Sequence, residues 1–291
     1  MPEELARAKI NLTLEILGRR PDGYHEIETV LQTLALHDRL VFSPAKDGVF
    51  LTCDHPEVPA GEDNLAHRAA RLLMEETGKK AGAKIYLEKR IPVAAGLAGG
   101  SADAAAALKG LNSLWGTGLT PGELMALGAR LGADVPFCLA GGTALARGKG
   151  EALETLPPLR GLGVVLVKPA FGVSTAQAYR LYDQQSGGAG ARPAPPDERP
   201  DRQAMLAAVA KKDAGQIGRL LNNVFEPVIA GVYPEIAQIK KALLEAGALG
   251  ACLSGSGPTV FGLWADEAQA RQAAGRLPGR PGWTVLVTAT A

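Results

Sequence analysis

A glycine-rich loop in the first half of the chain has the residue types of a phosphate-binding site. The loop, Pro92-Val-Ala-Ala-Gly-Leu-Ala-Gly-Gly-Ser-Ala-Asp103, lies between an expected strand and an alanine-rich segment. Closely spaced backbone N–H groups and the N-terminus of a following helix attract anions. No Lys-Ser or Lys-Thr follows the glycines, and Gly96, Gly99 and Gly100 lack the spacing of a dinucleotide-binding loop. A turn that only serves packing is the remaining alternative.

Lys9 and Asp134 could supply the charges for moving a phosphoryl group to a hydroxyl. Such a transfer needs an acceptor hydroxyl aimed at the phosphorus and a group that takes its proton. Asp134 could be this base if a cation such as Lys9 kept it ionised and oriented. Asn11 lies on the same strand face as Lys9 and could hydrogen-bond a polar ligand. The simpler alternatives are a solvent-exposed edge-strand lysine and an aspartate that caps a helix or turn before Pro136.

Tyr24, His25 and Tyr179 could stack on a planar base and hydrogen-bond its edge. They stand out because only 5% of the residues are aromatic, and the tyrosines lie near expected ligand loops. The commoner alternative is partial burial of each ring with its polar tip in water. The four histidines do not have the spacing of metal ligands, and there is no signature of a Ser–His–Asp triad. No metal-binding residue is therefore assigned.

The composition places the chain among globular proteins and limits its partners. Of the 291 residues, 46% are hydrophobic and 21% are charged, and the net charge of +1 gives no basic field for nucleic acid. The sequence has no apolar segment long enough to cross a membrane and no apolar leader at its N-terminus. The three scattered cysteines are expected to be free, buried thiols in a reducing cytoplasm. We therefore expect a cytoplasmic protein with no nucleic-acid or membrane partner.

In the first half of the chain, alternation and capping residues define most of the expected elements. Residues 8–16 alternate between apolar and polar side chains, which predicts a half-buried strand with Lys9 on its polar face. We expect Ser101 to cap the helix after the glycine loop, with Asp103 in its first turn. The other expected elements are extended segments near 26–34, 39–43, 48–53 and 83–90, a helix over 64–77, a helix from the Thr120–Glu123 capping box to about Gly132, and a hairpin of 142–146 with 152–156.

The second half is expected to mix helices and strands around a second glycine loop at 252–258. Residues 184–202 are rich in glycine, proline and charge, which predicts an exposed, mobile insertion. A boundary near 155–160 divides the chain into two predicted domains, 1–156 and 157–291. The other expected elements are strands at 163–168, 259–264 and 283–289, a helix capped by Ser174, and helices near 203–221, 234–246 and 266–276.

Three of these motifs occur in the order seen in the GHMP kinases, a superfamily of small-molecule kinases that the chain resembles over nearly its whole length. They are the glycine loop, the turn Ala133-Asp-Val-Pro136 and the late loop Ser254-Gly-Ser-Gly-Pro258. Within the superfamily, the chain resembles most the members that act on 4-diphosphocytidyl-2-C-methyl-D-erythritol. This narrower resemblance is carried by Ala8-Lys-Ile-Asn-Leu12, Arg20-Pro-Asp-Gly-Tyr-His25, Gly132-Ala-Asp-Val-Pro-Phe137, Gly141-Gly-Thr-Ala144 and Val173-Ser-Thr175.

The resemblance implies an α+β fold of two domains with the active site in the cleft between them. The N-terminal domain would be of a ribosomal-protein-like type and the C-terminal domain ferredoxin-like. The implied reaction moves the γ-phosphoryl of ATP, with Mg²⁺, to the 2-hydroxyl of the cytidine diphosphate methylerythritol substrate. Asp134 would be the general base, with Lys9 orienting it and the hydroxyl. We expect a monomer or a weak homodimer.

The resemblance also assigns binding residues. The substrate would be held by Asn11, Tyr24, His25 and Tyr179, and the loop of Gly255 to Gly257 would lie near the active-site cleft. The ATP phosphates would be held by Pro92, Val93, Ala94, Ala95, Gly96, Leu97, Ala98, Gly99, Gly100, Ser101 and Ala102.

The glycine loop departs from the commonest pattern of the superfamily at two alanines. Ala98 stands where glycine is frequent, which argues against a role that needs a positive φ there. Ala102 stands where serine is frequent and lacks a hydroxyl for phosphate or magnesium. Two alternatives remain: another GHMP kinase, acting on homoserine or a mevalonate-type alcohol, or a non-catalytic nucleotide- or RNA-binding protein on the same scaffold.

Overall fold

The computed structural model describes residues 2–185 and 199–291, and these form two compact units. Unit 1 consists of Met1–Ala8, Leu36–Val93 and Ala98–Gly141, and unit 2 consists of Lys9–Ala35, Ala94–Leu97 and Gly142–Ala291. Two long strands, β1 (Glu3–Arg19) and β2 (His25–Ala45), contribute residues to both units. The division into domains 1–156 and 157–291 stays a prediction.

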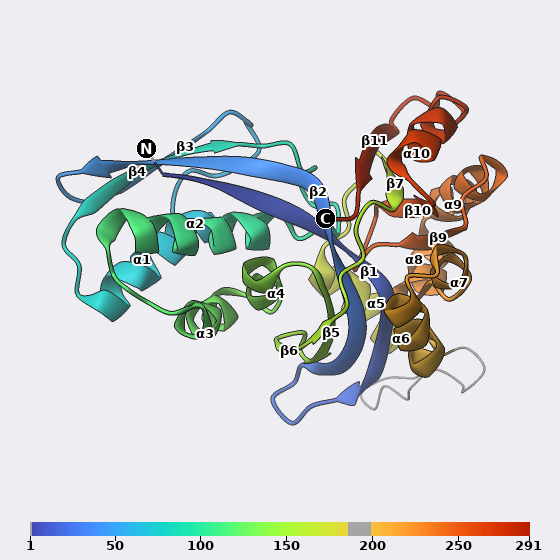
Figure 1. The fold of residues 1–291 in the computed structure, drawn as a ribbon, viewed down its shortest axis with the longest axis horizontal. Helices are drawn as coiled ribbons and strands as arrows, with labels where there is room; N and C mark the ends of the chain where they lie inside the picture. The colour runs from blue at the N-terminus through green and yellow to red at the C-terminus, as the bar shows by residue number, and fades with distance from the viewer. Residues whose placement is uncertain (1, 186–198) are drawn as a thin grey trace. The chain divides into compact units, whose positions relative to one another are not determined.

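Unit 1 is a strand layer covered on one side by helices. Strand β4 (Gly82–Glu88) pairs antiparallel with residues 39–45 of β2 and parallel with β3 (Val49–Cys53). Figure 1 shows the four helices of the unit on one side of these strands. They are α1 (Leu65–Thr77), α2 (Gly99–Trp115), α3 (Pro121–Leu131) and α4 (Val135–Ala140).

The core of unit 1 is built from strand residues packed against the alanine-rich helix α2. Leu40 and Phe42 of β2 are fully buried in one cluster with Leu108 of α2. Gly110 permits this close approach, because a Cβ there would lie 2.2 Å from the Phe42 ring. The predicted capping box at the start of α3 is confirmed. The helix expected over 64–77 is α1, which Asn64 caps by accepting from Ala66 N at 2.8 Å.

In unit 2, the remaining parts of β1 and β2 pair with short strands. β8 (Asn222–Asn223) pairs parallel with β1, and β5 (Thr143–Gly148) pairs antiparallel with residues 27–32 of β2. β6 (Ala152–Leu156) completes the predicted hairpin with β5. Together with the strands of unit 1, the hydrogen-bonded order is β3-β4-β2-β1-β8, with β5 and β6 branching from β2.

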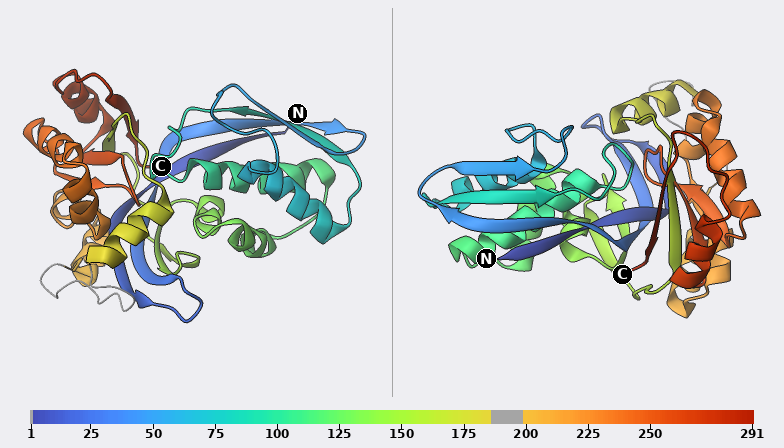
Figure 2. Two further views of the ribbon diagram at one scale, coloured as in Figure 1. Left: turned by 180° about the vertical axis from the view of Figure 1, so that it is seen from behind. Right: turned by 90° about the horizontal axis from the view of Figure 1, so that it is seen from above.

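A second, four-stranded sheet lies within unit 2, in the order β11-β7-β10-β9. Helices α9 and α10 cover one face of it (Figures 1 and 2). The strands are β7 (Gly163–Lys168), β9 (Gly250–Leu253), β10 (Val260–Trp264) and β11 (Thr284–Ala289). The helices of the unit are α5 (Thr175–Gln185), α6 (Arg202–Lys211), α7 (Ala214–Arg219), α8 (Phe225–Val232), α9 (Glu235–Glu245) and α10 (Glu267–Ala274).

The structure corrects several expected elements. The extended segments near 26–34 and 39–43 are one continuous strand, β2. The helix expected over 203–221 is two helices, because Lys212 adopts a φ of 54° and Asp213 then caps α7 through Gln216 N. Helix α8 and strand β9 were not predicted. Most of the insertion expected at 184–202 falls on residues 186–198, outside the described residues.

The prediction that β1 is half-buried is wrong, because both of its faces are covered. On the polar face, Lys9 is 4% exposed, Asn11 2%, Thr13 5% and Glu15 7%. The apolar residues Leu14 and Ile16 belong to the core of unit 2. The alternation of residue types therefore marks one face that packs in the core and another that carries buried polar groups.

The three cysteines are free, as predicted, but only Cys252 is buried, whereas Cys53 and Cys138 are half-buried. Among residues 2–185 and 199–291, no helix combines the length and the apolar character that a membrane span needs.

Candidate active site

Lys9 is held inside unit 2 by a chain of hydrogen bonds along β1 and β2. Its Nζ donates to Asn11 Oδ1 at 2.8 Å, and Asn11 Nδ2 donates to Thr29 Oγ1 at 2.8 Å. Thr29 Oγ1 in turn donates to the carbonyl of Thr13 at 2.6 Å. A lysine that points to solvent from an edge strand is thereby excluded, because Lys9 is buried and oriented.

Two glycine-containing loops lie against Lys9 within unit 2. Lys9 N donates to Leu97 O at 3.1 Å, and Ser254 Oγ donates to Gly96 O at 3.0 Å. A Cβ on Gly255 would lie 3.3 Å from Lys9 Nζ, so this glycine allows the late loop to approach the ammonium group. The structure therefore brings together Lys9, the middle of the glycine loop and the loop of residues 254–257.

The backbone of the glycine loop alternates through the left-handed region. Ala94, Gly96 and Ala98 have φ values of 51°, 75° and 57°. The expectation that Ala98 avoids a positive φ is therefore wrong; the packed loop imposes this conformation at a cost of about 1–2 kcal/mol for an alanine. Alternating left-handed residues turn successive N–H groups toward a common point, which is the geometry of an anion-binding nest.

The helix after the loop begins earlier than predicted. Its first residue is Gly99, and Ala98 occupies the N-cap position without a side-chain hydrogen bond. Ser101 is therefore in the first turn and does not cap the helix, and Asp103 lies beyond that turn, where it is buried. No side chain at the N-cap position therefore satisfies the backbone N–H groups at the start of α2.

Asp134 lies in unit 1, at the N-cap position of the short helix α4. Its φ is −79°, and its side chain makes no capping hydrogen bond to that helix. Asp134 therefore does not act as a side-chain cap of α4. A Cβ on Gly132 would lie 4.0 Å from Ser101 Oγ, so the turn that carries Asp134 is next to the start of α2.

The three aromatic candidates have different surroundings in unit 2. Tyr24 is 60% exposed, and Lys149 Nζ lies 4.7 Å from the centre of its ring. His25 is buried, with Nε2 2.8 Å from Asp183 Oδ1. The rings of His25 and Tyr179 stack with centres 4.6 Å apart and an interplanar angle of 20°. The structure thus brings His25 and Tyr179 together and leaves Tyr24 accessible on the turn between β1 and β2.

Asn223 fixes the backbone of the late loop at residues 253–255, a role that the sequence did not predict. Its Nδ2 donates to Leu253 O and Gly255 O, both at 2.8 Å, and its Oδ1 accepts from Phe225 N at 2.9 Å. All of these partners are backbone groups. No residue pattern could have identified this role, because it depends on the folded position of the loop.

Unit 1 contains a buried cluster of charged side chains that was not predicted from the sequence. Lys89 Nζ forms ion pairs with Asp38 and, at 2.8 Å, with Asp103. Burial raises the pKa of Asp103 from its ordinary 3.8 to about 7, although the charge of Lys89 acts in the opposite direction. The side chains come from β2, the segment after β4 and helix α2, so only the tertiary fold brings them together.

This raised pKa predicts an unusual dependence of stability on pH. Between about pH 4 and pH 7 the folded chain binds more protons at Asp103 than the unfolded chain, so the free energy of unfolding falls as pH rises, by at most about 1.4 kcal/mol per pH unit. Asp103→Asn lacks this dependence. Urea unfolding of both proteins from about pH 5 to about pH 8 should show the stability of the native chain falling relative to that of the variant until about pH 7.

The comparison between the two proteins cancels the contributions of titratable groups outside the cluster of Lys89, Asp38 and Asp103. Burial also raises the pKa values of Glu4 and Glu15, but these residues are present in both proteins and their effects cancel. Parallel stability curves for the two proteins across this pH range would contradict the prediction.

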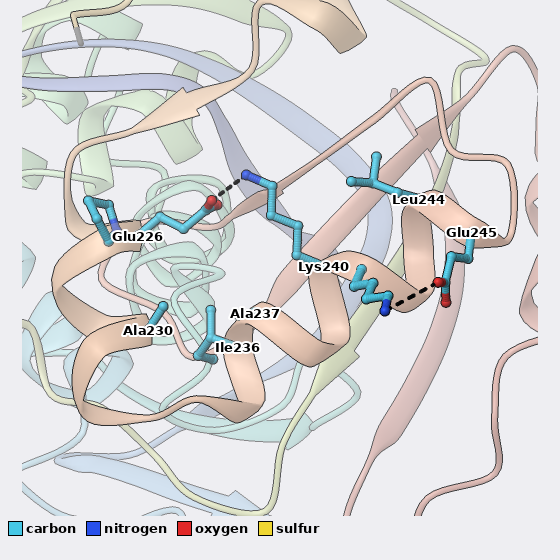
Figure 3. Close-up of a pocket in the computed structure, with 9 residues that line it drawn as sticks. Glu226, Ala230, Ile236, Ala237, Lys240, Leu244 and Glu245 are labelled. Carbon is cyan, nitrogen blue, oxygen red and sulfur yellow. Dashed lines mark hydrogen bonds and ion pairs between the residues drawn. The ribbon is translucent and has the colours of Figure 1, made fainter.

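Each unit contains a pocket. One, of about 400 Å³, lies between α8 and α9 and is mostly aliphatic (Figure 3). Its charged side chains pair with each other, Lys240 with Glu226 and Lys241 with Glu245. Another, of about 530 Å³, lies in unit 1 beside α1. None of the predicted site residues lines either pocket, and within the described ranges no three His, Cys, Asp or Glu side chains form a metal-binding group.

Comparison with known proteins gives a consistent result. The family profile for the GHMP kinases N terminal domain matches residues 64–142, and the profile for the GHMP kinases C terminal domain matches residues 205–281. A 4-diphosphocytidyl-2-C-methyl-D-erythritol kinase of Pelotomaculum thermopropionicum is 56% identical over 287 residues, which cover 98% of this chain and 96% of that protein. The enzyme of the same name from Synechococcus sp. (strain JA-2-3B'a(2-13)) is 52% identical over 92% of this chain and 87% of its own length.

A solved structure agrees with the sequence relatives. The crystal structure of a 4-(cytidine 5'-diphospho)-2C-methyl-D-erythritol kinase superimposes with a TM-score of 0.81 at 36% identity, covering 99% of both chains. The mixed α/β architecture of this fold agrees with the elements expected from the sequence. The chain therefore belongs to the GHMP kinase family, in the group of the 4-diphosphocytidyl-2-C-methyl-D-erythritol kinases.

Proposed function

We propose that the chain transfers the γ-phosphoryl of ATP to the 2-hydroxyl of 4-diphosphocytidyl-2-C-methyl-D-erythritol, giving the 2-phosphate and ADP, in the non-mevalonate route to isoprenoid precursors. One observation carries this proposal: a buried lysine, oriented by Asn11, lies against the middle of a loop with alternating left-handed residues. This arrangement places a fixed positive charge beside backbone N–H groups suited to phosphate. The free cysteines fit a reducing cytoplasm, where we place the enzyme.

In the proposed mechanism, Asp134 acts as the general base. It takes the proton of the 2-hydroxyl as that oxygen forms a bond to the γ-phosphorus, and the bond from this phosphorus to the β–γ bridging oxygen breaks. The electron pair stays on the bridging oxygen, and ADP leaves. Lys9 orients the hydroxyl and the carboxylate, and its hydrogen bond to Asn11 fixes the position of the ammonium group.

The ATP phosphates would be bound in the loop of residues 92–102 by the backbone N–H groups of residues 93–102. The first turn of α2 contributes N–H groups and a positive helix end, and Ser101 adds a hydroxyl in that turn. Mg²⁺ would arrive with the nucleotide, bound by phosphate oxygens and water, which suits its reluctance to lose its hydration shell. The metal would neutralise charge on the phosphates during transfer.

We assign the cytidine part of the substrate to Tyr24, His25, Tyr179 and Asn11. Tyr24 offers an accessible ring, and the stacked pair of His25 and Tyr179 offers planar groups in the same unit. The amide of Asn11 can form one further hydrogen bond at each end besides those to Lys9 and Thr29. These residues would select the cytidine substrate over simple alcohols.

Replacing Tyr24 by alanine should weaken substrate binding without disturbing the fold. Loss of a base–aromatic stack costs about 1–3 kcal/mol, which corresponds to a rise of about 5- to 150-fold in KM for the cytidine substrate. Steady-state kinetics with ATP at saturation would measure this rise. Tyr86→Ala is the matched control, because Tyr86 is 43% exposed on β4 in unit 1 and should leave KM unchanged. Equal KM values for the native protein and the Tyr24→Ala variant would show that Tyr24 does not bind the substrate.

A coupled assay of ADP release with a panel of acceptors tests the function itself. ADP should be released with 4-diphosphocytidyl-2-C-methyl-D-erythritol and not with homoserine or mevalonate. Turnover with one of the other alcohols would reassign the substrate, and binding of nucleotide or RNA without turnover would favour a non-catalytic protein. Light scattering during size exclusion would test the proposed monomer or weak homodimer.

A further inference from the structure

The buried cluster of Lys89, Asp38 and Asp103 has no part in the mechanism proposed above. Asp38 is 0% exposed and Asp103 3%. One cation faces two carboxylates, and Asp103 Oδ1 is buried without a hydrogen-bond partner. Removing charges from water costs several kcal/mol for each ion, and a well-packed apolar cluster would often stabilise a protein better. Stability alone therefore does not account for the cluster.

The cluster joins the two ends of the glycine loop. Before the loop, Asp38 Oδ1 accepts from Arg90 N at 2.5 Å and from Ile91 N at 2.8 Å. After the loop, Asp103 lies in α2, where its Oδ2 accepts from Lys89 Nζ at 2.8 Å. A Cβ on Gly99 would lie 3.3 Å from the same Nζ, so the first residue of α2 packs directly on the ammonium group.

The loop between these ends has a backbone that needs to be held. Ala94 and Ala98 both have positive φ values, which alanine adopts only when its surroundings impose them. Ala98 is the N-cap residue of α2, so the strain lies at the point where the loop joins the helix. A link between residues 89–91 and α2 limits how far the loop can open and relax this strain.

We propose that Lys89 is a positioning residue for ATP: by binding Asp38 and Asp103 together, it fixes the two ends of the glycine loop so that its N–H groups are arranged for phosphate before the nucleotide binds. This inference rests on the proposed function, because it takes the loop as the ATP site. Lys89 acts through the loop backbone and does not itself touch the nucleotide.

The test separates ATP binding from chemistry and from folding. Asp103→Ala removes the link to α2 but leaves Lys89 paired with Asp38, and Lys89→Met removes both links at similar side-chain length. Each variant should raise KM for ATP on the order of tenfold, from the loss of a hydrogen bond between charged groups, with KM for the cytidine substrate unchanged. Asp103→Asn keeps an acceptor for Lys89 and should restore most of the ATP affinity.

A matched control comes from the other end of the same helix. Asn112 binds Leu119 O at 3.0 Å through Nδ2, so Asn112→Ala should lower the melting temperature without changing KM for ATP. If Lys89→Met does not fold, the two Asp103 variants still decide the question. Unchanged KM for ATP in Asp103→Ala, with normal turnover of the native enzyme, would overturn the positioning role alone. A native enzyme without ATP-dependent turnover would instead overturn the proposed function.

Discussion

Asp134→Asn should lower the turnover number by about 10²–10⁴-fold, which is the usual contribution of a general base. Asparagine has nearly the same shape as aspartate but cannot take the proton of the acceptor hydroxyl. The substitution removes no capping hydrogen bond from α4, and asparagine is as suitable as aspartate at an N-cap position. The variant should therefore fold normally and bind ATP with unchanged affinity, as calorimetric titration with a non-hydrolysable ATP analogue would measure.

An aspartate at another helix start provides the control for this variant. Asp213 is exposed and caps α7 by accepting from Gln216 N at 3.0 Å, and asparagine can replace it in that role. Asp213→Asn should keep full turnover. Full turnover in Asp134→Asn as well would exclude Asp134 as the base and require another group to accept the proton.

Gly96→Ala should have the second large effect, because the alanine side chain has no room. Its Cβ would lie 2.2 Å from Ser254 O and 2.9 Å from Gly257 O, and neither backbone atom can rotate away. The φ of 75° adds about 1–2 kcal/mol of strain for any residue with a Cβ. The loop would have to move away from residues 254–257, and with it the carbonyl of Leu97 that accepts from Lys9 N. A displacement of about 1 Å in such a site lowers activity about 100-fold.

Gly161→Ala is a control that introduces the strain of a positive φ without the steric clash. Gly161 has a similar φ of 83°, but no atom lies within 4 Å of a Cβ built there. Both variants should lose stability in thermal unfolding, whereas only Gly96→Ala should lose turnover at a temperature where both are folded. A Gly96 variant with native turnover would show that the contact between the two loops is not needed for activity.

The sequence predicted those elements whose signals are local. Asn64 and Gly78 mark the ends of α1, and the Thr120–Glu123 capping box marks the start of α3, because each signal acts within a few residues. Helix α8 was missed because Pro227 and Gly231 interrupt its pattern, although tertiary packing buries Phe225 and Ile229. The break between α6 and α7 was missed because one capping aspartate, Asp213, outweighs an otherwise helical composition.

For the candidate site, the sequence predicted residue types but not their surroundings. Lys9 and the glycine loop were identified from motifs, whereas the orientation of Lys9 depends on the hydrogen bond that it donates to Asn11 and on the distant loop of residues 254–257. The positive φ of Ala98 follows from the packing of the loop and contradicts the preference of alanine itself. Lys89 could not be distinguished from a surface lysine, because both of its carboxylate partners are distant in sequence.

Because β1 and β2 contribute residues to both units, the two units are completed at different times during translation. Unit 1 ends at Gly141, so it is complete in sequence when less than half of the chain has been made. Lys9–Ala35 belongs to unit 2, whose other segments come mainly from residues 142–291. Leu14 and Ile16 therefore lack packing partners such as Val165 and Val167 until the ribosome has added the second half of the chain. Slower synthesis just after Gly141 would prolong the period in which these apolar strand residues are unprotected on the nascent chain.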